Sequence, residues 1–364
     1  MQKSKKIWTY QVSQEFDFKQ ELFDNYKLKG RFYEDINNFY EQIGILCHPS
    51  LKPASGKEYV EPNILNFLNV LIDVNTIKIL FALFPTNKVI DVKFNNNLFE
   101  YSNLEFLINE LLNKPHNLFS IVYEWNSKIK HGEEIVAFDN LIPETESIGI
   151  KSQLMIAKLV NVPKIEALCL RGNMLSDEAG IQIMNYLKTN STIRILNLYK
   201  NNFTSAIVPS FLSCIENNKK LEEINLGANH FVDSDIIGLK DLLGKIYITN
   251  EEAENIQKKA RDRDMIIEKN KKLKNQKKPE EPLPIVEEIT QIGDAWYIVR
   301  NNRIKNLNLM LNNFSKDCYE TLTYILDVSD ELFITIDGKV FNLEQREKLI
   351  DPRQKYSSRV YLTK

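Results

Sequence analysis

The sequence is short of the residues that mark nucleotide-binding and disulfide-bonded proteins. Only 12 glycines and 12 prolines occur in 364 residues, and neither a GxxxxGK[ST] nor a GxGxxG motif is present. The chain therefore lacks a recognisable phosphate-binding loop. Its four cysteines are far apart and form no CxxC or Cys/His cluster: Cys47, Cys169, Cys214 and Cys318. That spacing is typical of reduced thiols in an intracellular protein, so we expect no metal and no cofactor.

The charge is balanced, and no long apolar run is uninterrupted. Lys and Arg number 47 against 49 Asp and Glu, a formal net charge of −2, whereas nucleic-acid-binding domains are normally strongly basic. The most apolar stretch, residues 64–84, contains Asn66, Asp73 and Lys78, which disfavour a membrane span. No signal-peptide pattern is visible near the N-terminus. We expect a cytoplasmic protein with no nucleic-acid partner and no membrane insertion.

Catalytic groupings are also missing. No nucleophile and base stand in a recognisable arrangement, and the acidic pair Asp262 and Asp264 alternates with arginines, as on a solvated helix face. The histidines stand in unrelated sequence contexts: His48, His116, His131 and His230. The sequence therefore predicts a protein that is not an enzyme and has no small-molecule substrate.

What the sequence does contain is a repeat. The pattern Leu-x-Leu-x-x-Asn is clearest at residues 168–173, 196–201 and 224–229, whose asparagines are 28 residues apart in both steps. Alternate residues of a short strand point to opposite faces, so both core leucines can point inward. The asparagine would then satisfy backbone groups where the chain leaves the strand. Weaker copies extend the set of expected structural asparagines to six: Asn97, Asn126, Asn173, Asn201, Asn229 and Asn312.

After each asparagine the apolar period changes from two to about 3.6 residues, which predicts a helix. The run Leu168-Cys-Leu170-Arg-Gly-Asn173, its two successors and the helix start Ser176-Asp177-Glu178-Ala179-Gly180 resemble the ribonuclease-inhibitor-like leucine-rich-repeat family. The resemblance implies an α/β fold in the form of a curved solenoid, with parallel strands inside the curve and helices outside.

Two irregularities and the end segments set the expected domain organisation. The repeat asparagines are separated by 47 residues between Asn126 and Asn173 and by 83 between Asn229 and Asn312, so the second gap holds a large insertion. We expect five parts: 1–76, a helical, aromatic-rich N-terminal cap; 77–248, repeats; 249–300, a charged helix and a Pro/Lys/Glu linker; 301–345, final repeats and a cap; and 346–364, a C-terminal tail.

A narrower resemblance concerns function. Repeats, then Leu242-Leu243-Gly244-Lys245-Ile246-Tyr247-Ile248-Thr249, a charged helix, a linker and a returning repeat at residues 304–309 follow one another in this order. That order is similar to the leucine-rich repeat-containing protein 71 family, which is associated with motile cilia. The resemblance implies a non-enzymatic scaffold of the ciliary axoneme and cytoskeleton, whose partners are axonemal or microtubule-associated proteins.

Two candidate binding surfaces follow from the expected fold. Strand residues between the core positions should face the concave side, and an aromatic, an arginine and several amides there suit a protein partner. These candidates are Arg171, Asn197, Tyr199, Glu223, Asn225, Asn308 and Met310, with Arg171 and Tyr199 as the expected anchors. The alternative is that contacts use helices or termini instead. In the insertion, docking on an acidic surface is expected of Lys269, Lys271, Lys272 and Lys274, unless the segment is only a solvated tail.

Two other functions remain open from the sequence. A GTPase-activating protein of the Ran-activator type would use the same repeat class, but residues 353–364 are net positive where those activators carry an acidic tail. A ubiquitin-ligase substrate receptor would need an F-box, which is not recognisable here.

Overall fold

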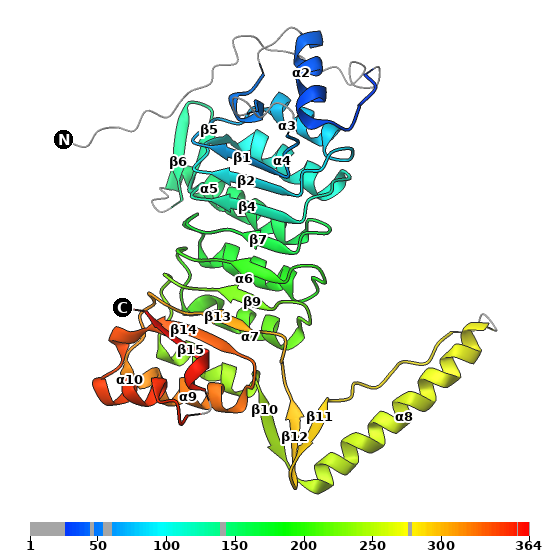
Figure 1. Ribbon diagram of the computed structural model, residues 1–364, viewed down its shortest axis with the longest axis vertical. Coiled ribbons are helices and arrows are strands. Elements are labelled where there is room, and N and C mark those ends of the chain that lie inside the picture. Colours follow the sequence, from blue (N-terminus) through cyan, green and yellow to red (C-terminus); the bar gives the residue numbers. More distant parts are fainter. Residues whose placement is uncertain are drawn as a thin grey trace.

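A single sheet runs along the long axis of the molecule (Figure 1). The computed structural model describes residues 26–43, 47–53, 60–138, 143–275, 279–354 and 356–363. The sheet has nine strands, and every neighbouring pair is parallel. In spatial order they are β1 (Ile64–Leu68), β2 (Asp91–Asn95), β4 (Ser120–Glu124), β7 (Ala167–Cys169), β8 (Ile195–Asn197), β9 (Glu223–Asn225), β13 (Asn306–Asn308), β14 (Phe333–Asp337) and β15 (Val360–Thr363).

Helices form the second layer. Successive helices contact one another in chain order and share one hydrophobic core with the inward-facing strand residues. The core side of each strand carries the repeat leucines and isoleucines, for example Leu168, Leu196 and Ile224, all at most 2% exposed. The α-helices of the layer are α3 (Val74–Leu83), α4 (Tyr101–Asn113), α5 (Pro143–Ala157), α6 (Asp177–Leu187), α7 (Val208–Asn217) and α9 (Tyr319–Val328).

Short 3₁₀ segments and end helices complete this layer. The connection after β9 is 3₁₀ throughout, η4 (Asp233–Asp241), and the last connection contains α10 (Leu343–Ile350). At the N-terminal end α2 (Phe32–Ile43) packs near α3. The remaining 3₁₀ turns are η1 (Pro49–Leu51), η2 (Lys158–Asn161), η3 (Ser205–Ile207), η5 (Lys316–Cys318), η6 (Gly338–Val340) and η7 (Ser357–Arg359).

The prediction of a curved ribonuclease-inhibitor-like solenoid is therefore wrong. The structure is an α/β fold organised around one nine-stranded, all-parallel sheet with helices, and it carries two additional three-stranded sheets. Its connections are unequal, since α5 has 15 residues, α7 has 10, and η4 is not an α-helix. A regular array would need the same supersecondary unit in every repeat.

The sheet also extends beyond the expected repeat boundaries. β1 lies within residues 1–76, so the N-terminal segment is not purely helical, and β15 lies within the expected C-terminal tail. Residues 1–25, which hold much of the aromatic-rich sequence, lie outside the described residues. A small sheet is added by β3 (Phe99–Glu100), which precedes β4 in the chain, and by β5 (Lys128–His131) and β6 (Glu134–Ala137), which follow it.

The large insertion combines a sheet with a helix. We call residues 245–299 the arm: β10 (Lys245–Ile248), α8 (Asn250–Asn275), β11 (Ile289–Ile292) and β12 (Ala295–Val299). The three strands pair antiparallel in the order β10-β12-β11, and α8 extends away from the body (Figure 1). The base of α8 packs in a small core of its own: Ile248, Ala253, Ile256 and Ile298.

The repeat asparagines link neighbouring strands of the main sheet. The Asn201 amide donates to the carbonyl oxygens of Leu170 (3.1 Å) and Leu198 (2.9 Å), and its Oδ1 accepts from the N–H of Leu175 (3.1 Å). The residue before each of the six asparagines has a positive φ, between 51° and 69°, which turns the chain out of the strand. After the last repeat asparagine, Asn312, an aspartate takes the same role as acceptor: the Asp337 carboxylate accepts the N–H of Leu311 at 2.7 Å.

Candidate functional site

The face of the main sheet opposite the helices carries rows of side chains that cross the strands. Asn197, Asn225 and Asn308 occupy the same register position on β8, β9 and β13. Tyr199, Gly227 and Met310 each lie two residues after one of these asparagines. Arg171 lies at the corresponding position after β7. All of these side chains except Gly227 are half-buried.

The three asparagines share one hydrogen-bonding arrangement. The Oδ1 atom of each accepts the backbone N–H two residues later, from Tyr199, Gly227 and Met310, at 3.0 Å in all three cases. The acceptor end of each amide is thus occupied, and in the part of the chain that the structure describes no bond is found for the NH₂ group. Since parallel strands are about 4.8 Å apart, these groups form a row of available donors.

Next to this row, Arg171 lies between two aromatic side chains. Its guanidinium carbon is 5.3 Å from the ring centroid of Trp125 and 5.0 Å from that of Tyr199. Trp125 follows β4 and Tyr199 follows β8, so the two rings flank the arginine from the neighbouring strands on either side. Lys200 Nζ also lies over the Trp125 ring, at 5.2 Å. We call these four residues the Arg171 stack.

Glycines make room for the stack. A Cβ on Gly172 would stand 2.4 Å from Cε3 of Trp125, so the indole packs directly on the Gly172 backbone. A Cβ on Gly227 would stand 3.0 Å from Cδ2 of Tyr199 and 3.1 Å from Cγ of Met310. Gly172 therefore leaves the space that the Trp125 indole occupies, and a side chain at Gly227 would crowd Tyr199 and Met310.

Arg171 has no acidic partner among the residues that the structure describes. Its Nε atom is buried and makes no hydrogen bond. The nearby Glu124 carboxylate instead accepts the Cys169 thiol, with 2.9 Å between Sγ and Oε1. Burial, and then this hydrogen bond, raise the pKa of Cys169 to about 12, so the thiol stays protonated and keeps Glu124 engaged.

Arg194 on the same sheet shows the opposite arrangement. Its guanidinium contacts Glu222 at 2.9 Å and Glu166 at 3.3 Å, one on each neighbouring strand connection. Arg194 thus ties neighbouring strand connections together, whereas Arg171 has no such carboxylate partner among the described residues.

Six of the seven residues expected on this face come together in the two adjacent rows: Arg171, Asn197, Tyr199, Asn225, Asn308 and Met310. Glu223 lies in a further row beside Ile195 and Asn306, toward the other ends of the strands. Trp125 and Lys200 were not among the residues expected from the sequence. Each directly precedes a repeat asparagine, so an alignment of the repeats position by position would have placed them beside Arg171.

The lysines expected to bind from the insertion lie near the far end of α8 and are partly neutralised. Lys269 forms an ion pair with Glu281 of the returning linker, and Lys271 forms one with Glu268 at 2.6 Å. For Lys272 and Lys274 the structure shows no ion pair within the described residues. Two of the four lysines are thus engaged inside the arm itself.

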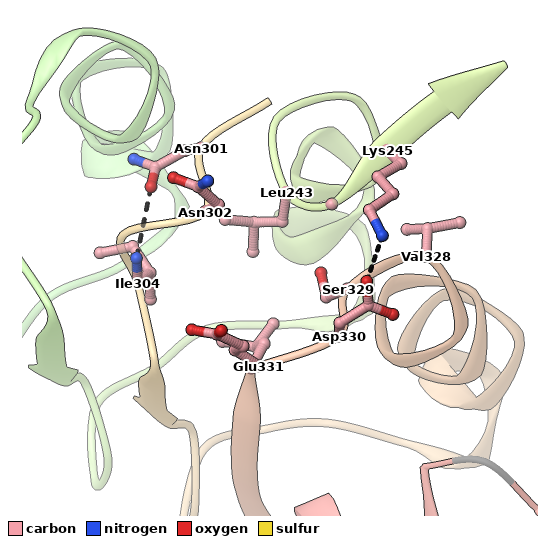
Figure 2. Close-up of a pocket in the computed structure, with 11 residues that line it drawn as sticks. Leu243, Lys245, Asn301, Asn302, Ile304, Val328, Ser329, Asp330 and Glu331 are labelled. Atoms are coloured by element: carbon pink, nitrogen blue, oxygen red, sulfur yellow. Dashed lines mark hydrogen bonds and ion pairs between the residues drawn. The ribbon is translucent and has the colours of Figure 1, made fainter. Parts of the chain in front are cut away.

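A cavity of about 150 Å³ lies where the arm joins the body (Figure 2). Lys245 at the start of β10 forms an ion pair with Asp330, just beyond the end of α9, and Asn301 accepts the backbone N–H of Ile304 at 3.3 Å. Gly244, with φ +85°, is so close to α9 that a Cβ would stand 2.5 Å from the carbonyl oxygen of Val328. These contacts indicate a joint that fixes the base of the arm.

Neither known families nor a metal site adds to the description of this surface. No family model matches the chain, and no curated protein matches it. Within the described ranges, no three His, Cys, Asp or Glu side chains are grouped so that they could hold a metal ion. Over the same ranges, no helix combines the length and the apolarity that a membrane crossing requires.

Proposed function

We propose that this chain is a non-enzymatic scaffold that binds another protein through the Arg171 stack and the adjacent asparagine row. The observation that carries the proposal is the arginine held between Trp125 and Tyr199 without an acidic partner in the described part of the chain. Arginine and the large aromatic residues dominate the binding energy of protein interfaces, because they combine apolar area with directed hydrogen bonds.

The environments of the ionisable side chains support binding rather than catalysis. His48 and His116 are buried, and burial lowers both of their pKa values. Their Nδ1 atoms accept backbone N–H groups of Ser50 and Leu118. Burial likewise raises the pKa values of all four thiols. The two imidazoles are buried and hydrogen-bonded within the fold, and the thiols stay protonated at neutral pH, which disfavours nucleophilic attack by the cysteines.

The proposed setting is the ciliary axoneme, as part of a microtubule-associated assembly. This part rests on the order of repeats, charged helix, linker and returning repeat in the sequence. The arm, fixed at its base and extending from the body, would offer a second contact at a distance from the Arg171 stack. Fractionation tests the setting: the protein should remain with axonemes after detergent extraction, and its recovery in the detergent-soluble fraction would contradict it.

Quantitative affinity purification from the native cell tests the binding surface. The tagged protein is compared with Trp125→Ala, Arg171→Ala and the matched control Arg194→Ala, which removes an arginine already paired within the fold. We expect one or more bound proteins to fall at least about tenfold in the first two variants and to be retained by the control. Equal recovery with all four proteins would show that the surface is not where partners bind.

A further inference from the structure

We infer that the segment recognised by the Arg171 stack is an acidic peptide, whose carboxylate binds the guanidinium edge of Arg171. The inference rests on the proposed function and names the chemistry of the partner. The inference is carried by the two rings that lie against the guanidinium while no described acidic residue pairs with it.

The Arg171 side chain is held in place before any partner binds. A free arginine side chain loses rotamer freedom when it binds, but Arg171 is already held between Trp125 and Tyr199. The two rings lie against the guanidinium, so a new partner reaches the N–H groups that they leave uncovered. A carboxylate matches that edge with two parallel hydrogen bonds, which are among the strongest in proteins.

The surface around Trp125 carries local positive charge. Arg171 and Lys200 place two positive charges around the Trp125 ring, and neither has an ion pair within the ranges described. The Cys169 thiol donates a hydrogen bond to Glu124, the carboxylate beside them, and the two cations outnumber that single carboxylate. Because the whole chain carries a formal charge of only −2, attraction to an acidic segment would come from this local surface and not from the net charge.

The asparagine row beside Arg171 presents hydrogen-bond donors. Asn197, Asn225 and Asn308 use their oxygen atoms internally, so the surface beside Arg171 offers N–H groups and few acceptors. Such a row suits the carboxylate and carbonyl oxygens of an acidic peptide better than the ammonium groups of a basic one.

Direct binding of defined peptides tests the inference. Fluorescently labelled peptides of equal length, rich in Glu, Gln or Lys, are titrated with the full chain, and affinity is measured by fluorescence anisotropy at low and physiological salt. The Glu peptide should bind most tightly and should lose affinity as salt rises. Arg171→Ala should weaken it at least about tenfold, Arg171→Lys should weaken it less, and Arg194→Ala should leave it unchanged.

Two outcomes would overturn the inference. One is that the Gln or Lys peptide binds as tightly as the Glu peptide, and the other is that Arg171→Ala leaves Glu-peptide binding unchanged. Thermal unfolding of each variant shows whether it is folded, and Arg171→Lys keeps the test informative if Arg171→Ala is not. If native partners still depend on Arg171 while no acidic preference is found, the proposed function stands and the acidic chemistry fails. If native partners do not depend on Arg171 either, both fail.

Discussion

The indole of Trp125 lies on the backbone of Gly172, at a place where any Cβ on that residue would stand 2.4 Å from the ring. Gly172→Ala should therefore displace Trp125 and disrupt the Arg171 stack. Gly172 also has φ +69°, so the substitution adds the cost of a left-handed backbone, about 1–2 kcal/mol for an L residue. We expect the unfolding free energy, measured by urea denaturation, to decrease by more than this backbone cost alone. We also expect weaker binding to the partner.

Gly132→Ala is the matched control. Gly132 has a similar φ of +62°, but nothing lies within 4 Å of the added Cβ. It should show the backbone cost alone and leave partner binding unchanged. If the two substitutions were equally destabilising and neither affected binding, the close packing of Trp125 on Gly172 would be irrelevant to the site.

A second prediction concerns the hydrogen bonds of the repeat asparagines. Asn201→Ala removes the side chain that bonds Leu170, Leu198 and Leu175, and so leaves buried backbone groups unpaired. At about 1–3 kcal/mol for each unpaired buried group, we expect a loss of about 3 kcal/mol after partial relaxation. The neighbouring Asn202→Ala should change the unfolding free energy by less than about 0.5 kcal/mol. Similar losses for both variants in urea denaturation would refute this role.

A third prediction concerns pH. His116 is 3% exposed, and burial is the main reason that its folded pKa lies below 6.5. Below about pH 6.5 the unfolded chain binds a proton at this histidine that the folded chain does not accept, which favours unfolding. The contribution of His116 to the unfolding free energy is therefore complete above that pH and is lost as the pH falls toward the folded pKa. In His116→Gln the fall in unfolding free energy between about pH 7 and pH 5 should be smaller than in the wild type. An identical pH slope in both proteins would rule out the contribution.

A fourth prediction concerns the linker that returns along α8. The Asn270 amide donates to the Glu281 carbonyl and accepts the Glu281 N–H, both at 2.7 Å, and Asn270 is 7% exposed. Asn270→Ala should release this segment and increase hydrogen exchange at the amide of Glu281. Lys269→Ala removes only the exposed ion pair to the same residue and should change exchange much less. The reverse order of effects would show that the ion pair, and not the amide, holds the linker.

The sequence was most informative where one residue performs one local task. Asn173, Asn201 and Asn229 could be located because each must bond to backbone one strand away, which fixes the residue type and the spacing. β1 was missed because its segment, Ile-Leu-Asn-Phe-Leu, lies in a long apolar run that is not followed by a repeat asparagine. Periodicity alone does not separate such a strand from a buried helix.

Features that join distant segments were beyond the sequence. Residues 245–248 pair with residues 296–299 across the whole length of α8, and neither segment signals the other. The Arg171 stack is likewise assembled from residues that follow three different strands, and Trp125 and Arg171 are 46 positions apart in the sequence. The expectation of a regular solenoid failed for a related reason, since the repeat motif fixes the strands but not the length or type of each connection.

The most direct test of the account is site-specific photo-cross-linking in the native assembly. A benzoylphenylalanine is placed at Ile195, on the exposed sheet face near Asn197, or at Tyr324, on the outer side of α9; the two positions are 42% and 45% exposed. The account predicts that partner proteins cross-link to the Ile195 variant and that Arg171→Ala abolishes the product. Cross-links from Tyr324 alone would contradict it and would place the binding surface on the helices.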